Sequence, residues 1–179
     1  MLFRSDDMTV IGDANPDFIG GFSNNLSWKG FDLNLFFQFS YGGDLLNANR
    51  LVFEGNSGRI LQNQFATVLD RWTPDNQNNT MFVARGGGNR IYSSRVIEDG
   101  SYLRLKTVQL GYEIPKSLLK TVKVKTLRFY VSAQNLLTWT KYTGVDPEVS
   151  VYNSALTPGF DYSVYPRAKT ITFGVNLGL

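Results

Sequence analysis

The segment from Phe31 to Tyr41 alternates apolar and polar side chains with a period of two. One face of it carries Phe31, Leu33, Leu35, Phe37, Phe39 and Tyr41. The other face carries Asp32, Asn34, Gln38 and Ser40, with Phe36 as its one apolar residue. This period predicts a β-strand with one apolar and one polar face. Its eleven residues exceed the usual globular strand and, tilted by about 45°, would cross the roughly 30 Å hydrocarbon core of a bilayer.

Four further segments show the same alternation and predict strands at about 18–29, 102–112, 127–136 and 168–179. The phase is least regular at the start of 102–112. The last segment sets large apolar residues against small polar ones, with Ile171, Phe173, Val175, Leu177 and Leu179 on the apolar face. Large apolar side chains outside and small polar ones inside are typical of a barrel wall.

The connections between these strands alternate between shorter and longer. Lys29-Gly30 predicts a tight turn, and 113–126 is a moderate connection. The segments 42–101 and 137–167 are long, and the first contains one predicted helix at about Leu61 to Arg71. Outer-membrane barrels have short periplasmic turns and longer extracellular loops, so we expect 1–17, 42–101 and 137–167 to face outside.

The sequence therefore predicts an all-β fold, namely five strands of an antiparallel up-and-down transmembrane β-barrel. Bacterial barrels of this kind have at least eight strands, and lipid does not tolerate open sheet edges. We therefore expect the remaining strands upstream of this chain. The start, MLFRSDDMTV, has no secretory-signal pattern, which also indicates a fragment.

Composition narrows the function classes. Hydrophobic residues make up 42% and mean hydropathy is −0.18, with no apolar run long enough for a membrane helix. The net charge is +3 with scattered basic residues, so we expect no nucleic-acid partner. The chain has no Cys and no His, which removes disulfides, thiolate metal sites and the usual general base. We expect no catalytic residue, no metal and no cofactor.

Three groups of acidic residues are candidate sites: Asp6, Asp7 and Asp13; Asp70 and Asp75; Asp146 and Glu148. The first group lacks the spacing of a calcium loop. The other two could be glycosidase carboxyl pairs, but each lies beside a proline and is typical of a turn. Solvated loops account for all three groups.

Aromatic residues make up 14% of the chain, and five of them in 137–167 are candidate substrate contacts: Trp139, Tyr142, Tyr152, Tyr162 and Tyr165. Their rings could stack on sugars at an extracellular mouth. Tyr and Trp also collect at membrane interfaces, which is the alternative interpretation.

Five phrases of the sequence carry a more specific signal. They are IGDANPDFIGGFSNNLSWKGFDLNLFFQFSYGGD at 11–44, RWTPDNQ at 71–77, EDGSYLRLKTVQLGYEIPKSLL at 98–119, RFYVSAQNLLTWTKYTGVDPEV at 128–149 and YPRAKTITFGVNLGL at 165–179. In this order they resemble the C-terminal end of the SusC/RagA-like family of TonB-linked outer-membrane transporters. The resemblance runs from about Met8 to the end of the chain.

The resemblance implies a non-enzymatic outer-membrane transporter of about 22 strands, whose plug domain is absent here. It implies import of glycans or peptides, driven by the TonB complex through the absent N-terminal region, together with a SusD-like surface lipoprotein. It also implies that the last strand is the barrel-assembly signal, although Leu179 stands where an aromatic residue is common. Two alternatives stay open from the residues: a soluble all-β carbohydrate-binding module, and a reading frame with no function of its own.

Overall fold

The computed structural model describes residues 8–55, 63–77, 81, 92–120, 124–148, 150–151 and 157–179. The chain divides into two compact units, which we describe separately. The sheet unit comprises Pro16–Gly42, Ser101–Lys141 and Pro166–Leu179. The loop unit comprises Met1–Asn15, Gly43–Gly100 and Tyr142–Tyr165.

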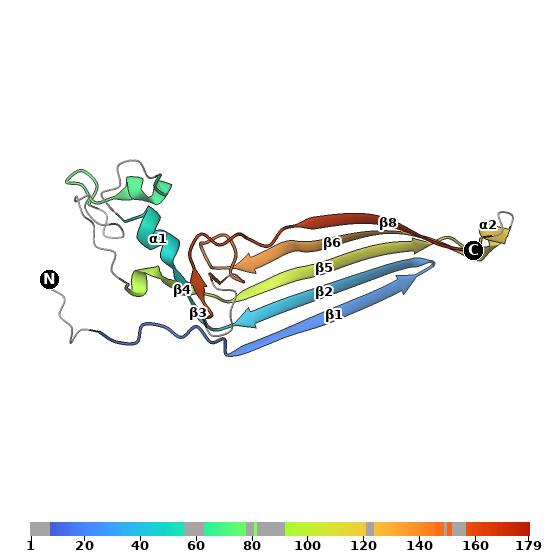
Figure 1. The fold of residues 1–179 in the computed structure, drawn as a ribbon, viewed down its shortest axis with the longest axis horizontal. Helices are drawn as coiled ribbons and strands as arrows, with labels where there is room; N and C mark the ends of the chain where they lie inside the picture. The colour runs from blue at the N-terminus through green and yellow to red at the C-terminus, as the bar shows by residue number, and fades with distance from the viewer. Residues whose placement is uncertain are drawn as a thin grey trace. The chain divides into compact units, whose positions relative to one another are not determined.

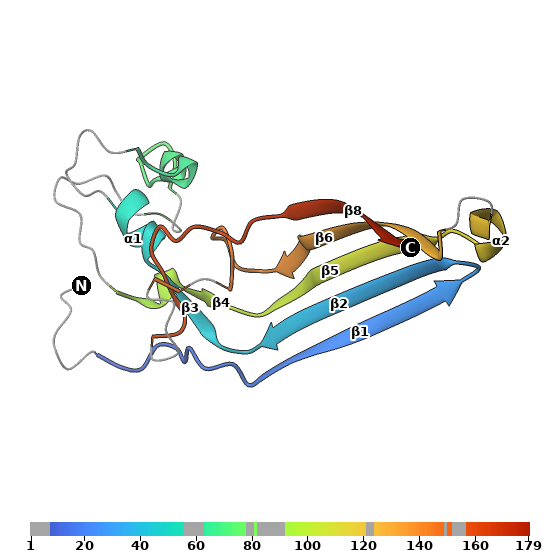
Figure 2. The same cartoon turned by 45° about the vertical axis from the view of Figure 1, so that its right-hand side comes forward.

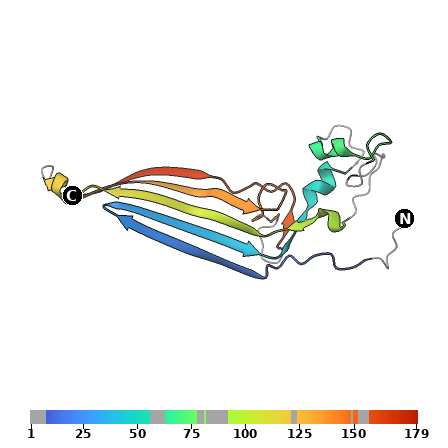
Figure 3. The ribbon, with the colours of Figure 1, turned by 180° about the vertical axis from the view of Figure 1, so that it is seen from behind.

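The sheet unit is one antiparallel sheet of five long strands in the order β1-β2-β5-β6-β8 (Figure 1). Their bounds are β1 Phe18–Trp28, β2 Phe31–Tyr41, β5 Tyr102–Glu113, β6 Thr126–Thr140 and β8 Thr170–Gly178. Strands β1 and β8 lie at the two edges, as Figure 2 also shows. The same order is visible from behind in Figure 3.

The first hairpin has its tight turn at Lys29-Gly30, where the sequence predicts it. Lys29 and Gly30 join β1 to β2 with φ of 46° and 88°, and two positive φ values in a two-residue loop are the requirement of a type I′ turn. Because this turn fixes the register, Trp28 pairs with Phe31 and Phe18 pairs with Tyr41. Directly paired residues share a face, so the apolar residues of both strands lie together.

A bulge explains the irregular phase at the start of β5. Phe36 of β2 pairs with Thr107, whereas its neighbour Phe37 pairs with Leu105. Lys106 is therefore an extra residue in β5, and it shifts the alternation by one position. Leu105 then shares the apolar face with Phe37 despite being out of phase in the sequence.

Strand β6 is longer than the predicted 127–136. It continues to Thr140, because Leu137 and Trp139 pair with Leu105 and Leu103 of β5. The prediction ended too early since Asn135, which has a φ of 52°, interrupts the alternation. Trp139 consequently belongs to a strand and not to the long loop in which we expected it.

The loop unit contains short elements that the sequence did not predict. Its sheet has the order β4-β3-β7, formed by Ile97–Asp99, Asp44–Asn47 and Phe160–Asp161. Its α-helix α1 covers Ala48–Phe53, and 3-10 helices cover Ala66–Asp70 (η2) and Ser94–Val96 (η3). A small core is formed by Ala48, Leu51 and Val96, with Leu46 and Phe160 against it.

The helix expected at about Leu61 to Arg71 is reduced, within the described residues, to the single 3-10 helix η2. Phe65 before it is extended and Arg71 after it has a ψ of 151°, so the helix cannot continue on either side. A short α-helix, α2, covers Lys116–Leu119 in the sheet unit. No helix of the described part is long and apolar enough to cross a membrane.

Candidate functional site

One face of the five-stranded sheet is predominantly apolar, with Asn24 of β1 as a polar residue on it. Strand pairing brings its residues into cross-strand rows, for example Leu26, Leu33, Leu110, Val131 and Phe173. Many of them are exposed, and Phe173 exposes 80% of its surface. We call this surface the apolar face. Its exposed members are Phe18, Phe22, Leu26, Trp28, Phe31, Tyr41, Leu110, Phe129, Leu137, Trp139, Ile171, Phe173, Val175 and Leu177.

Aromatic pairs lie at both ends of the apolar face and also near its middle, where Phe22 stacks on Phe37. Phe18 stacks on Tyr41 with ring centroids 5.0 Å apart, at the end where the long connections leave the sheet. Phe31 lies 4.4 Å from Tyr112 at the end of the Lys29-Gly30 turn. Cross-strand aromatic pairs stabilise a sheet, and amphipathic rings at the two ends of an apolar band are typical of membrane interfaces.

The opposite face of the sheet is polar and we call it the polar face. Arg128 of β6 donates to both carboxylate oxygens of Asp32 in β2, at 2.9 Å from Nε and 2.5 Å from Nη2. The pair crosses the intervening strand at Gly111, where any side chain would collide with both partners. This glycine therefore provides the space for a bidentate ion pair across three strands.

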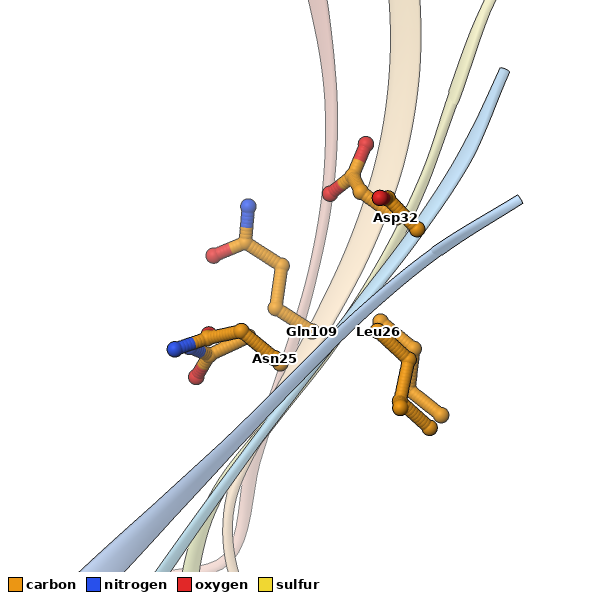
Figure 4. Close-up of a pocket in the computed structure, with 7 residues that line it drawn as sticks. Asn25, Leu26, Asp32 and Gln109 are labelled. Carbon is orange, nitrogen blue, oxygen red and sulfur yellow. The ribbon is translucent and has the colours of Figure 1, made fainter. Parts of the chain in front are cut away.

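A shallow pocket lies over the first hairpin on the polar face. Asn34 donates to Asn25 across the strands, and Gln109 projects to the same side from β5 (Figure 4). In the same view Leu26 points to the opposite side of the ribbons. The polar face thus presents amide and carboxylate groups that can hydrogen-bond water or a polar solute.

Glu98 is the central acceptor of the loop unit. Its carboxylate accepts from Asn47 Nδ2 at 3.0 Å, Arg50 Nη1 at 3.2 Å and both the backbone N and Oγ1 of Thr143 at 2.8 Å. Burial alone would raise the pKa of Glu98, but the bonds from Thr143, Asn47 and Arg50 hold it below its usual value. One carboxylate therefore joins three segments that are distant in the sequence.

Glu54 forms a second charged centre beside α1. It accepts from Arg50 Nε at 3.0 Å, Arg95 Nη2 at 2.5 Å and Thr67 Oγ1 at 2.8 Å. Its side chain is only 3% exposed. The loop unit is thus held by buried polar groups as much as by its small core, and buried charges of this kind need their partners.

The five predicted aromatic contacts occupy different environments. Trp139 lies in β6 on the apolar face and is half exposed. Tyr142 is buried, and its hydroxyl donates to Asp161 Oδ2 at 2.6 Å. Tyr162 and Tyr165 are exposed. Tyr152 lies outside the described residues.

Tyr142 can be buried because its hydroxyl donates a hydrogen bond to Asp161. Loss of hydration, first, and then the neighbouring Asp161 raise the pKa of Tyr142. The phenol therefore stays protonated and can donate to the buried carboxylate. No local pattern in the sequence marks this pair, because its members are 19 residues apart.

The residues of the last strand project from one face of β8. Ile171, Phe173, Val175 and Leu177 are all exposed, as is Leu179 beyond the strand. Their role as a barrel-assembly signal stays a prediction.

The described members of the acidic groups do not come together as a site. Asp6 and Asp7 lie outside the described residues, whereas Asp13 accepts bonds from its neighbour Asn15. Asp146 accepts from the backbone N–H of Glu148, as in a turn, but it is buried and not solvated as expected. Within the described ranges, no three His, Cys, Asp or Glu side chains gather in a way that could hold a metal ion.

Comparison with known proteins finds similarity to several TonB-dependent receptors. The chain is 44% identical to TonB-dependent receptor P3 of Formosa agariphila, an alignment covering 96% of this chain and 17% of that protein. It is 29% identical to TonB-dependent receptor SusC of Bacteroides thetaiotaomicron, over 97% of this chain and 16% of the relative. No protein-family model matches.

Among solved structures, the chain resembles the RagAB peptide importer in the open-open state. The TM-score is 0.85 at 29% identity, covering 99% of this chain and 19% of that one. The closed-closed state of the same importer gives a TM-score of 0.83 at 30% identity over 98% of this chain and 19% of that one. The chain therefore spans less than a fifth of the length of these relatives.

Proposed function

Because the chain belongs to the SusC/RagA-like family of TonB-dependent receptors, which are outer-membrane transporters and not enzymes, we propose that it supplies part of the barrel wall of such a transporter. It contributes five neighbouring strands near the C-terminal end of a barrel of about 22 strands. The long connections face outside, and the plug domain belongs to the part of the receptor not contained in this sequence.

The observation that carries this proposal is the exposed apolar face. Soluble monomers rarely expose a contiguous apolar patch larger than a few hundred Å², whereas this face covers all five strands. Phe31 to Tyr41 is ten residue steps, or about 34 Å along the strand. At a tilt of about 40° this rise is roughly 26 Å, close to the apolar band of about 25 Å around outer-membrane barrels.

The two edges of the sheet support the same proposal. In the described part of the chain, β1 and β8 each pair with a strand on one side only. An unpaired edge in lipid costs several kcal/mol for each unsatisfied backbone group. Neighbouring strands of a longer receptor would pair with both edges and close the cylinder.

A soluble carbohydrate-binding sandwich is disfavoured by the same face. In a sandwich the apolar residues of one sheet are buried against a second sheet. Ile171, Phe173 and Val175 instead expose between 57% and 80% of their surface. Lipid is the environment that accommodates this exposure.

For the transported molecule, we propose a peptide or an oligosaccharide, captured beneath a SusD-like surface lipoprotein and released inward through TonB. Likeness to a peptide importer and to SusC supports this. The loop unit would form part of the extracellular mouth. Trp139 would then lie in the interfacial girdle, and Tyr162 and Tyr165 are the accessible rings available to a substrate.

The test is deletion of the loop unit in the full-length receptor. Residues 43–100 or 142–165 are each replaced by a short Gly-Ser linker, which leaves all five strands intact. The matched control replaces 116–120, at the opposite end of β5 and β6. We expect normal outer-membrane insertion in all three variants, with uptake and lipoprotein co-purification reduced only in the first two. Unchanged uptake and lipoprotein retention in both loop deletions would refute the proposed role.

A further inference from the structure

Charge is divided unevenly between the two units. The sheet unit carries eleven Lys and Arg against three Asp and Glu, whereas the loop unit carries seven against twelve. All eight lysines of the chain lie in the sheet unit. A net charge of +3 for the whole chain conceals this separation.

Four of these lysines gather at the end of the sheet that carries the Lys29-Gly30 turn. We call this set the basic rim: Lys29, Lys116, Lys120 and Lys125. All four are exposed. Figure 1 shows the β1-β2 turn, α2 and the C-terminus at the same end of the sheet.

Backbone hydrogen bonds fix this placement. Glu113, three residues before Lys116, donates its N–H to Gly30 O at 2.8 Å, next to Lys29. Lys125 donates its N–H to Gly178 O at 2.8 Å, where β8 ends. The basic rim thus runs along the sheet end from β1 to β8.

The basic rim continues directly into the apolar face. The ammonium of Lys29 lies 5.0 Å from the centre of the Trp28 ring, and Trp28 exposes 68% of its surface. In α2, Leu119 is buried while Leu118 exposes 67% of its surface beside Lys116 and Lys120. Apolar groups next to ammonium groups match the boundary between acyl chains and headgroups, where lysines extend toward the polar layer.

Little acidic charge neutralises this end. Among the described side chains at this end, Glu113 is an exposed carboxylate, and the carboxylate of Asp32 is already bound to Arg128. We propose, on the basis of the barrel-wall function proposed above, that the basic rim binds anionic phospholipid headgroups of the leaflet that surrounds the turn end of the barrel. Phosphate oxygens would accept from the ammonium groups while Trp28 and Leu118 contact the acyl chains.

The experiment measures which lipids stay with the full-length receptor. The receptor is reconstituted in bilayers of equal phosphatidylglycerol and phosphatidylcholine, delipidated stepwise in detergent, and the retained lipids are quantified by mass spectrometry. We expect phosphatidylglycerol to be enriched by roughly threefold or more, since each lysine near an anionic surface contributes attraction. The triple variant Lys116→Gln, Lys120→Gln, Lys125→Gln should reduce the enrichment to about one.

Two controls isolate the charge at this rim. The triple Lys→Arg variant at the same positions should keep the enrichment, and Arg71→Gln, an exposed cation of the loop unit, should not change it. Inorganic phosphate should not displace the retained lipid, because the site requires the acyl chains as well as the headgroup. Displacement by phosphate would overturn the lipid assignment.

The possible failures are distinguishable. A receptor that does not reach the outer membrane contradicts the proposed function itself. A receptor that inserts and transports normally but retains both lipids equally, or whose Gln variant keeps the enrichment, contradicts only the headgroup contact.

Discussion

A lysine placed on the apolar face should destabilise the folded receptor according to its depth in the bilayer. Leu35 lies four residues from Phe31 on β2, which is about 14 Å along the strand and roughly 10 Å of depth at a 40° tilt. It is therefore near the middle of an apolar band of about 25 Å. Charged side chains on the lipid face cost about 2–4 kcal/mol at mid-depth and about 0–1 kcal/mol near the interface.

We expect Leu35→Lys to cost about 2–4 kcal/mol, which corresponds to roughly 30-fold to 1,000-fold in the folding equilibrium. Phe31→Lys, at the rim, should cost about 1 kcal/mol or less. The matched control is Asn34→Lys, which is adjacent to Leu35 but projects from the polar face, where it pairs with Asn25. It should cost little because the added charge meets water.

The assay compares the denaturant midpoints of the folded, heat-modifiable receptor in phospholipid vesicles for the three variants. The expected order of destabilisation is Leu35→Lys, then Phe31→Lys, then Asn34→Lys. The reasoning is refuted if Asn34→Lys destabilises the receptor as much as Leu35→Lys, because the two faces would then share one environment.

Three further substitutions test individual contacts. Glu98→Gln should weaken the loop unit at neutral pH. The pKa of Glu98 is lowered in the folded state, so its ionised carboxylate stabilises the wild type above the ordinary carboxyl pKa. That stabilisation is lost as the pH falls through the lowered pKa. Protease protection of the loop unit should therefore decrease in acid for the wild type and change less in the variant. Tyr142→Phe removes the hydroxyl that donates to the carboxylate of Asp161, a residue that is only 2% exposed. It should lower the stability of the loop unit by about 1–3 kcal/mol, measured as faster hydrogen exchange around both residues. Gly174→Val places its Cβ against the ring of Tyr130 and should lower the free energy of unfolding by about 1–3 kcal/mol. Adding Tyr130→Ala to the same variant should restore the stability.

The strands of the sheet unit were largely predictable because their signal is local. In β2 the alternation alone gives the bounds that the structure has, Phe31–Tyr41. Lys29-Gly30 likewise specifies its turn without reference to the rest of the chain. The family was recognisable for a related reason, since whole phrases of sequence around these strands resemble known receptors.

The irregularities of the sheet could not be predicted from periodicity. A bulge at Lys106 inverts the phase of β5, and only the pairing of Leu105 with Phe37 shows which face each side chain occupies. Strand β6 likewise continues past Asn135 because Leu137 and Trp139 pair with residues of β5. These features depend on the neighbouring strand and not on the residue's own sequence context.

The loop unit depends still more on distant contacts. Strand β3 pairs with β7 through Leu46 and Phe160, and four-residue strands carry no readable alternation. Glu98 acquires its partners from segments that lie about 45 and 51 residues away. The burial of Tyr142 follows from such contacts, so its ring could not be distinguished from the exposed rings of Tyr162 and Tyr165 beforehand.

The central claim is that the apolar face meets lipid while the polar face meets water. The absence of Cys in this chain allows nitroxide labels to be attached at single cysteines from residue 31 to residue 41 in the membrane-inserted receptor, with any cysteine elsewhere replaced. Collision with oxygen, which partitions into lipid, and with a water-soluble nickel complex is then measured at each position. The account predicts high oxygen accessibility at odd-numbered positions and high nickel accessibility at even-numbered ones, with a period of two. Equal accessibility at neighbouring positions, or odd positions shielded from both reagents, would contradict it.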